Sequence, residues 1–106
     1  MSSAPQDAGT DDASGDLREI RKRLDDVDQR LLTLLVERSN LVGEVIVYKR
    51  AHHMPVVDRA REDQMLQDIE ITAASAGLDP RIASQVLRAV IDAFTLLEVE
   101  HLGPDA

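Results

Sequence analysis

The stretch from Leu17 to Arg50, LREIRKRLDDVDQRLLTLLVERSNLVGEVIVYKR, decides the fold of this chain. Its apolar side chains recur in steps of four and three, which is the spacing of one face of an α-helix. This apolar stripe consists of Ile20, Leu24, Val27, Leu31, Leu34, Leu41, Val45 and Tyr48. The stretch contains no proline and a single glycine. With Asp16 as N-cap and an end near Ala51, the pattern predicts one helix roughly 50 Å long.

A cation interrupts the apolar stripe. Arg38 occupies the position between Leu34 and Leu41 where the spacing calls for an apolar residue. A guanidinium group on a core-facing stripe needs an anionic partner. Lys49 follows three helical turns later, and Arg21 comes earlier on the same side. Three cations on the inward side of one helix predict a binding site for an anion.

Helix signals continue after the long helix. Pro55 cannot continue it, and Asp58 is a suitable N-cap for a second helix. Gly77 supplies a C-terminal stop, and Asp79-Pro80 is a restart signal for a third helix. The second and third predicted helices end near residues 76 and 101. Since no strand-like alternation and no glycine-rich phosphate loop occur, the sequence predicts an all-α fold with three helices.

The length of the first helix has a consequence for assembly. The two shorter helices cannot cover an apolar stripe of this length, so a monomer would expose one end of it. We therefore expect an intertwined homodimer in which two long helices pack together. On a straight helix Arg21 and Lys49 lie roughly 42 Å apart, whereas Arg38 and Lys49 lie roughly 16 Å apart. Arg21 then serves a site belonging mainly to the other chain, or serves none.

Composition narrows the possible functions. The chain of 106 residues allows one domain, predicted to span residues 17–106 after a disordered acidic tail at 1–16 with four Asp and no Lys or Arg. A net charge of −8 argues against nucleic acid as a partner. Without cysteine there is no disulfide or thiolate metal site, and we predict neither a metal nor a cofactor. Because we find neither a signal peptide nor a membrane span, we expect a cytoplasmic protein.

The later helices add polar groups to the predicted site. Asp58, Arg61 and Glu62 lie at the start of the second helix, close in sequence to the end of the first. Glu98 continues the apolar row of the third helix, which consists of Leu87, Ile91 and Phe94. A carboxyl group at the end of an apolar row is a second departure from the expected pattern, after Arg38.

Several blocks resemble those of a known family. They are the segment from Asp28 to Arg38, in which Glu37-Arg38 follows LLTLL, and Pro55-Val56 leading to Asp58 and Arg61-Glu62. Over about residues 17–101 the chain is similar to the small, all-helical AroQ class of chorismate mutase. The resemblance implies an intertwined dimer of three-helix chains, which agrees with the expectation from helix length.

The resemblance also implies an activity and roles for the residues. Chorismate, a dianion, rearranges to prephenate in one pericyclic step without a covalent enzyme intermediate and without a cofactor. Arginine suits bidentate binding of carboxylates. The implied catalytic residues are Arg38, which binds a carboxylate, Lys49, which donates to the ether oxygen, and Glu98. The implied substrate-binding residues are Arg21 of the other protomer, Arg61, the ring-hydroxyl ligand Glu62 and the backbone of Asp58.

Two departures from the family pattern leave alternatives open. Glu98 stands where a glutamine is common, and a carboxyl group donates a hydrogen bond only when protonated. Phe94 stands where a small polar residue is common. This bulkier side chain leaves the size of the pocket and the identity of the substrate open. The alternatives are an isochorismate-pyruvate lyase or an aminodeoxychorismate mutase on the same scaffold, and a non-catalytic helical dimer. In the last case Arg38 forms an interhelical ion pair with Asp28 or Glu37.

Overall fold

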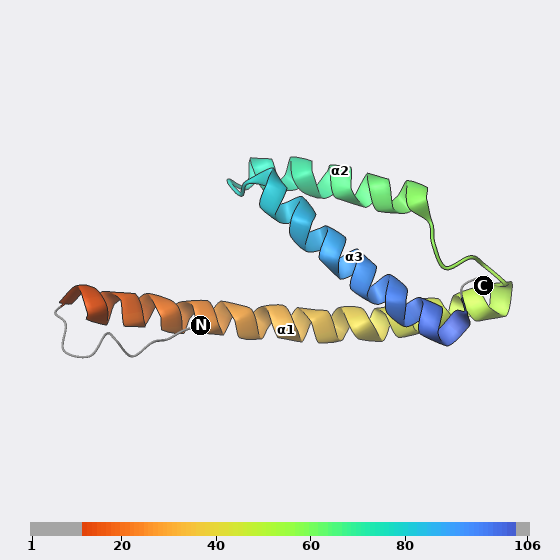
Figure 1. Cartoon of the computed structure of the whole chain (residues 1–106), viewed down its shortest axis with the longest axis horizontal. Coiled ribbons are helices and arrows are strands. Elements are labelled where there is room, and N and C mark those ends of the chain that lie inside the picture. Colours follow the sequence, from red (N-terminus) through yellow and green to blue (C-terminus); the bar gives the residue numbers. More distant parts are fainter. Residues whose placement is uncertain (1–11, 104–106) are drawn as a thin grey trace. The chain divides into compact units, whose positions relative to one another are not determined.

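The computed structural model describes residues 12–103, which form three α-helices, drawn in Figure 1. Helix α1 spans Asp12–His52, α2 spans Arg59–Ser75 and α3 spans Pro80–Leu102. Within residues 12–103 there is no strand. The prediction of an all-α fold with three helices is therefore confirmed. The chain divides into two compact parts, residues 1–38 and residues 39–106, called here the N-terminal and the C-terminal part.

Helix α1 begins earlier than expected. Its first residue is Asp12, four residues before the predicted N-cap Asp16. The predicted tail is therefore helical over residues 12–16, while residues 1–11 lie outside the described part of the chain. No proline stands between Asp12 and Asp16, and acidic residues are favourable near the positive end of the helix dipole. The local sequence thus permits an additional helical turn that the cap signal at Asp16 did not indicate.

The described N-terminal part is a single segment of α1 with a large exposed apolar surface. Its large apolar side chains between Leu17 and Val36 are 39% to 58% exposed. They are Leu17, Ile20, Leu24, Val27, Leu31, Leu32, Leu34, Leu35 and Val36. Most helical stability in proteins comes from packing of an apolar face. This segment therefore exposes apolar surface of the kind that packing buries in other helices.

The C-terminal part contains the core. Buried side chains come from all three helices and from the loop after α1: Val42, Ile46, Val56, Ala73, Ala83 and Ile91. Helices α2 and α3 pack against each other, joined by a short turn (Figure 1). The end of α3 lies against the end of α1, where Arg50 Nη2 donates to the carbonyl oxygen of His101 at 2.8 Å. The last turn of α1 is thereby fixed relative to α3.

The loop that joins α1 to α2 begins with a left-handed residue. His53 has φ of 53°, and the N–H of Met54 donates to the carbonyl of Lys49 at 3.0 Å. This bond closes the end of α1 in the way that a C-terminal glycine usually does. Asp58 then caps α2, because its Oδ1 accepts from the backbone N–H of Arg61 at 3.1 Å. The predicted break near Pro55 and the predicted cap are both confirmed.

The turn between α2 and α3 follows the predicted signals. Gly77 has φ of 85°, its N–H donates to Ala74 at 3.2 Å, and the N–H of Leu78 donates to Ala73 at 2.9 Å. This pair of bonds is the Schellman motif, in which a left-handed residue satisfies the last carbonyls of a helix. Gly77 is the left-handed residue here, so the predicted stop is confirmed.

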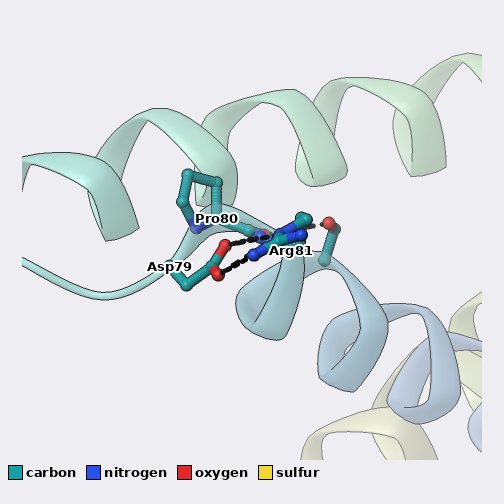
Figure 2. A network of polar contacts seen from close by, with 4 residues as sticks. Asp79, Pro80 and Arg81 are labelled. Atoms are coloured by element: carbon teal, nitrogen blue, oxygen red, sulfur yellow. Dashed lines mark hydrogen bonds and ion pairs between the residues drawn. The ribbon is translucent and has the colours of Figure 1, made fainter.

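The start of α3 is held by its own first residues. Figure 2 shows the Asp79 carboxylate facing Arg81, with Pro80 in the first turn. Arg81 donates to Asp79 from its side chain at 2.7 Å and from its backbone N–H at 2.9 Å. The side-chain bond, followed by the backbone bond, lowers the pKa of Asp79. The carboxylate therefore caps α3 at neutral pH, and this contribution is lost when the pH falls through the lowered pKa.

A pair of glycine substitutions tests this account of the helix ends. Gly77→Ala is expected to lower the free energy of unfolding by about 1 to 2 kcal/mol, because an L-residue is strained in the left-handed region. Gly43→Ala is the matched control: Gly43 lies inside α1, and a Cβ there meets nothing within 4 Å. It is expected to raise stability by up to about 1 kcal/mol through helix propensity. Thermal unfolding followed by circular dichroism measures both, and equal effects would contradict the prediction.

Candidate functional site

Lys49 is the centre of a half-buried polar cluster in the C-terminal part. Its Nζ donates to Glu98 Oε1 at 2.8 Å and to the carbonyl oxygen of Val56 at 2.8 Å. The side chains of Lys49 and Glu98 are only 16% and 13% exposed. The cluster thus joins the last turns of α1, the loop after it and the last turns of α3. The structure brings together two residues that the sequence predicted to be catalytic.

The cluster is suited to binding an electronegative atom. An ammonium group has three N–H donors, and the two bonds to Glu98 and Val56 use two of them. The third can serve a ligand while the first two keep the ammonium group in place. A charged donor in a mostly buried position is electrostatically stronger than one in water. Such an arrangement can stabilise negative charge that develops on a bound oxygen atom.

The start of α2 places the next predicted residues. The side chain of Asp58 is engaged as the N-cap, and the residue is exposed. Arg61 is also exposed, one turn into the helix. In the described structure the contact that joins these two residues is the capping bond to the backbone N–H of Arg61. The capping bond fixes the backbone of Arg61, while the role of its guanidinium group in binding an anion stays a prediction.

Glu62 contacts a residue that the sequence analysis missed. Its Oε1 accepts from Arg88 Nη1 of α3 at 3.3 Å, and Arg59 Nη1 lies at 4.0 Å from the same oxygen. The side chain of Glu62 is 13% exposed, that of Arg88 38% and that of Arg59 81%. Arg88 Nη1 also lies 3.7 Å from Asp92 Oδ1. A mostly buried carboxylate is thus compensated chiefly by one guanidinium group of the neighbouring helix.

The sequence contains only a weak signal for Arg88. Arg88 and Asp92 are four residues apart, which is the spacing of a surface ion pair along a helix. That spacing accounts for Arg88 without any contact to α2. Its role becomes visible only because α2 and α3 pack against each other and bring Glu62 within reach.

The remaining predicted residues lie in the N-terminal part or on α3. Arg21 and Arg38 belong to the N-terminal part, and both are half-buried. Every other described residue from 15 to 37 is exposed. The other five predicted site residues belong to the C-terminal part, where Lys49 and Glu98 are in direct contact. Phe94, one turn before Glu98, is half-buried.

Residues 12–103 contain no group of three or more His, Asp or Glu arranged to hold a metal ion. Among the same residues, no helix combines the length and the apolar character that crossing a membrane requires.

The chain is similar to known proteins over most of its length. Residues 20–99 match the family model described as chorismate mutase type II. A chorismate mutase of Methanocaldococcus jannaschii is 28% identical over 86 residues, covering 81% of this chain and 87% of that protein. A 4-amino-4-deoxychorismate mutase of Streptomyces pristinaespiralis is 30% identical over 100 residues, covering 94% of this chain and 78% of that protein.

Longer relatives share the same region. A bifunctional chorismate mutase/prephenate dehydratase of Enterobacter agglomerans is 34% identical over 73 residues. The match covers 69% of this chain but only 19% of that protein. The chain thus spans about a fifth of the length of the bifunctional relative that it matches.

Proposed function

The chain belongs to the chorismate mutase type II family, and we propose that it catalyses the rearrangement of chorismate to prephenate. The observation that supports this activity most directly is the contact of Lys49 with Glu98 at 2.8 Å in a mostly buried position. The reaction breaks a C–O bond and forms a C–C bond in one step. Negative charge develops on the ether oxygen as the C–O bond breaks, and a preorganised donor at that oxygen lowers the barrier.

Lys49 is the proposed donor to the ether oxygen. Its bonds to Glu98 and to the Val56 carbonyl hold the ammonium group before substrate arrives. Preorganisation of this kind avoids the cost of reorienting a flexible side chain during the reaction. The third N–H of the ammonium group is then directed to the oxygen whose charge increases in the transition state.

Glu98 is the proposed second donor. A protonated carboxyl group keeps acceptor capacity and gains one O–H donor. The oxygen that now accepts from Lys49, Oε1, can remain bonded to it, while a proton on Oε2 serves the ether oxygen. The two side chains then act as one unit, with Lys49 fixing the orientation of the carboxyl group.

The two carboxylates of the substrate require cationic partners. Following the family resemblance, we assign one carboxylate to Arg38 and propose that Arg61 and Arg21 of the other protomer complete the binding. Glu62 and the backbone of Asp58 are proposed to bind the ring hydroxyl. Binding at both ends restrains chorismate to the conformer in which the reacting atoms approach each other.

We propose that the active species is a homodimer. The nine large apolar side chains of the N-terminal part, from Leu17 to Val36, are at least 39% exposed. Six of them, Leu17, Ile20, Leu24, Val27, Leu31 and Leu34, recur at helical spacing and share one face, and an exposed apolar face marks an interaction surface. A second copy of the same helix offers a matching stripe, and in a two-fold dimer each chain covers the other. This arrangement is also the one in which Arg21 serves the site of the partner.

A second candidate activity is rearrangement of the 4-amino analogue. The S. pristinaespiralis relative carries the name 4-amino-4-deoxychorismate mutase and covers 94% of this chain. The two substrates differ in the group at carbon 4, so residues around that group decide between them. Isochorismate-pyruvate lyase activity and a non-catalytic dimer remain the alternatives that the sequence alone leaves open.

Direct incubation tests the proposed function. Purified protein is incubated separately with chorismate, with 4-amino-4-deoxychorismate and with isochorismate, and products are separated by chromatography. Prephenate from chorismate is the expected result. Pyruvate from isochorismate without prephenate from chorismate would replace the mutase by a lyase, and no product from any of the three would support the non-catalytic dimer.

The proposed role of Glu98 as a donor is tested with an amide of the same shape. Glu98→Gln accepts from Lys49 through its oxygen and always carries N–H donors. Its kcat/KM on chorismate is therefore expected to equal or exceed that of the wild type. A folded Glu98→Gln protein that turns over chorismate more slowly than the wild type would contradict the donor role.

A further inference from the structure

We infer that Arg88 is a positioning residue that makes the site select a neutral ring hydroxyl over a charged ring amine, and hence chorismate over its 4-amino analogue. The inference rests on the proposed function, in which Glu62 binds the group at carbon 4 of the ring. It concerns how the charge of Glu62 is compensated before a substrate is bound. The contact that carries it is the one between Arg88 of α3 and Glu62 of α2, at 3.3 Å.

The Glu62 carboxylate is compensated from two sides. Arg88 Nη1 donates to its Oε1 at 3.3 Å, and Arg59 Nη1 lies 4.0 Å from the same atom. Glu62 is 13% exposed, so its charge is poorly solvated and depends on these cations. Arg59 is 81% exposed and therefore strongly screened by water. Arg88, at 38% exposure and the shorter distance, is the principal partner.

This compensation discriminates between the two substrates. A hydroxyl group donates one hydrogen bond to a carboxylate oxygen without adding charge. An alkyl amine is protonated near neutral pH, so an amino group at the same place would put a further cation beside Arg88. Like charges brought together in a partly buried site are unfavourable, which is a common source of specificity. A carboxylate without Arg88 would instead attract the ammonium group.

Arg88 also orients the carboxylate. Its guanidinium group binds Oε1, which leaves Oε2 of Glu62 as the oxygen for the ring hydroxyl. Asp92 competes for Arg88 at 3.7 Å from Nη1, but it is 67% exposed and so binds the guanidinium less effectively. Arg88 touches no reacting atom in this scheme. It acts through Glu62, and its effect appears in the choice of substrate.

Substrate preference is the readout that separates this role from a merely structural one. The ratio of kcat/KM for chorismate to that for 4-amino-4-deoxychorismate is measured for the wild type and for Arg88→Gln. The wild type is expected to prefer chorismate, and Arg88→Gln is expected to move the ratio at least about tenfold toward the amino substrate. Arg88→Lys keeps the charge and is expected to restore most of the wild-type preference.

Two further variants complete the experiment. Arg81→Gln is the matched control: it removes a guanidinium group from the same helix, but one that is 85% exposed and pairs with Asp79. Its ratio is expected to equal that of the wild type. Asp92→Asn removes the competing carboxylate from an exposed position and is expected to move the ratio about twofold further toward chorismate. If circular dichroism shows that Arg88→Gln does not fold, the substrate ratio of Asp92→Asn alone tests the role of Arg88.

The outcomes distinguish this inference from the proposed function. Chorismate turnover with ratios that are unchanged in the Arg88 and Asp92 variants would overturn the inference and leave the proposed function standing. A wild-type preference for the amino substrate would overturn the inference as well. Turnover of neither substrate by the wild type would overturn both.

Discussion

Lys49→Ala is expected to lower kcat/KM on chorismate by about a hundred- to a thousand-fold, which corresponds to about 3 to 4 kcal/mol of transition-state stabilisation. The ammonium group is the donor that we assign to the ether oxygen. The Lys49–Glu98 cluster holds no second cation that could stabilise the negative charge developing on that oxygen. The loss should fall mainly on kcat, because the interaction strengthens as the C–O bond breaks. Steady-state kinetics at several chorismate concentrations separates kcat from KM.

The same substitution has a structural effect that must be measured separately. Removing Lys49 leaves Glu98, at 13% exposure, without its cation, and leaves the Val56 carbonyl without its donor. A buried acceptor that loses its hydrogen-bond donor lowers the free energy of unfolding by about 1 to 3 kcal/mol. The double variant Lys49→Ala/Glu98→Gln removes the stranded charge and should recover part of that stability without recovering turnover.

Arg50 supplies the control for position. Arg50→Ala also removes a contact between the ends of α1 and α3, the 2.8 Å bond to the His101 carbonyl, but Arg50 is exposed. Its kcat/KM is expected to stay within a few-fold of the wild type, in keeping with the modest effects of exposed contacts. Near-normal turnover of folded Lys49→Ala would remove Lys49 from the ether-oxygen role.

Helix boundaries were predictable wherever a local signal fixes them. Asp58, Gly77 and Asp79-Pro80 act through bonds to backbone atoms within a few residues, and the structure shows the two capping bonds and the left-handed glycine. The predicted start of α1 at Asp16 was wrong, since the helix begins at Asp12. Several successive residues in this stretch are able to begin a helix. Nothing in the local sequence makes Asp16 the obligatory first cap, since helix ends fray and capping is worth only about 1 kcal/mol.

The candidate site was predictable in part. Glu98 departed from the apolar row of the third helix, and Lys49 came three helical turns after Arg38, the departure in the first helix. Spacing thus marked both Lys49 and Glu98 as polar groups on inward faces. Their direct contact depends on how the ends of α1 and α3 pack, which no spacing within one helix reveals. Arg88 shows the same limitation. In the sequence its charge is accounted for by Asp92, four residues later on the same helix, whereas in the structure its closer contact is Glu62 on α2.

Mixing two inactive variants is expected to restore activity if the site is shared between protomers. Arg21→Ala and Arg38→Ala should each lose most of their kcat/KM, because each removes an arginine assigned to a substrate carboxylate. In a heterodimer of the two, one site lacks both arginines and the other retains both. With free exchange, half of the dimers are mixed, so recovery of about a quarter of wild-type activity is expected from the two-fold arrangement.

The recovery requires both a dimer and a contribution of Arg21 across its interface. Subunit exchange is followed by native mass spectrometry of chains that carry tags of different mass, and activity is measured on the same samples. A mixture of Arg38→Ala with Lys49→Ala is the control. We assign both residues to the site of the same chain, so mixing these two variants produces no site that contains both Arg38 and Lys49. One heterodimer site then lacks Arg38, the other lacks Lys49, and activity should stay at the level of the single variants. Absence of recovery in the Arg21→Ala and Arg38→Ala mixture, after exchange has been demonstrated, would assign Arg21 to the site of its own chain or to no site.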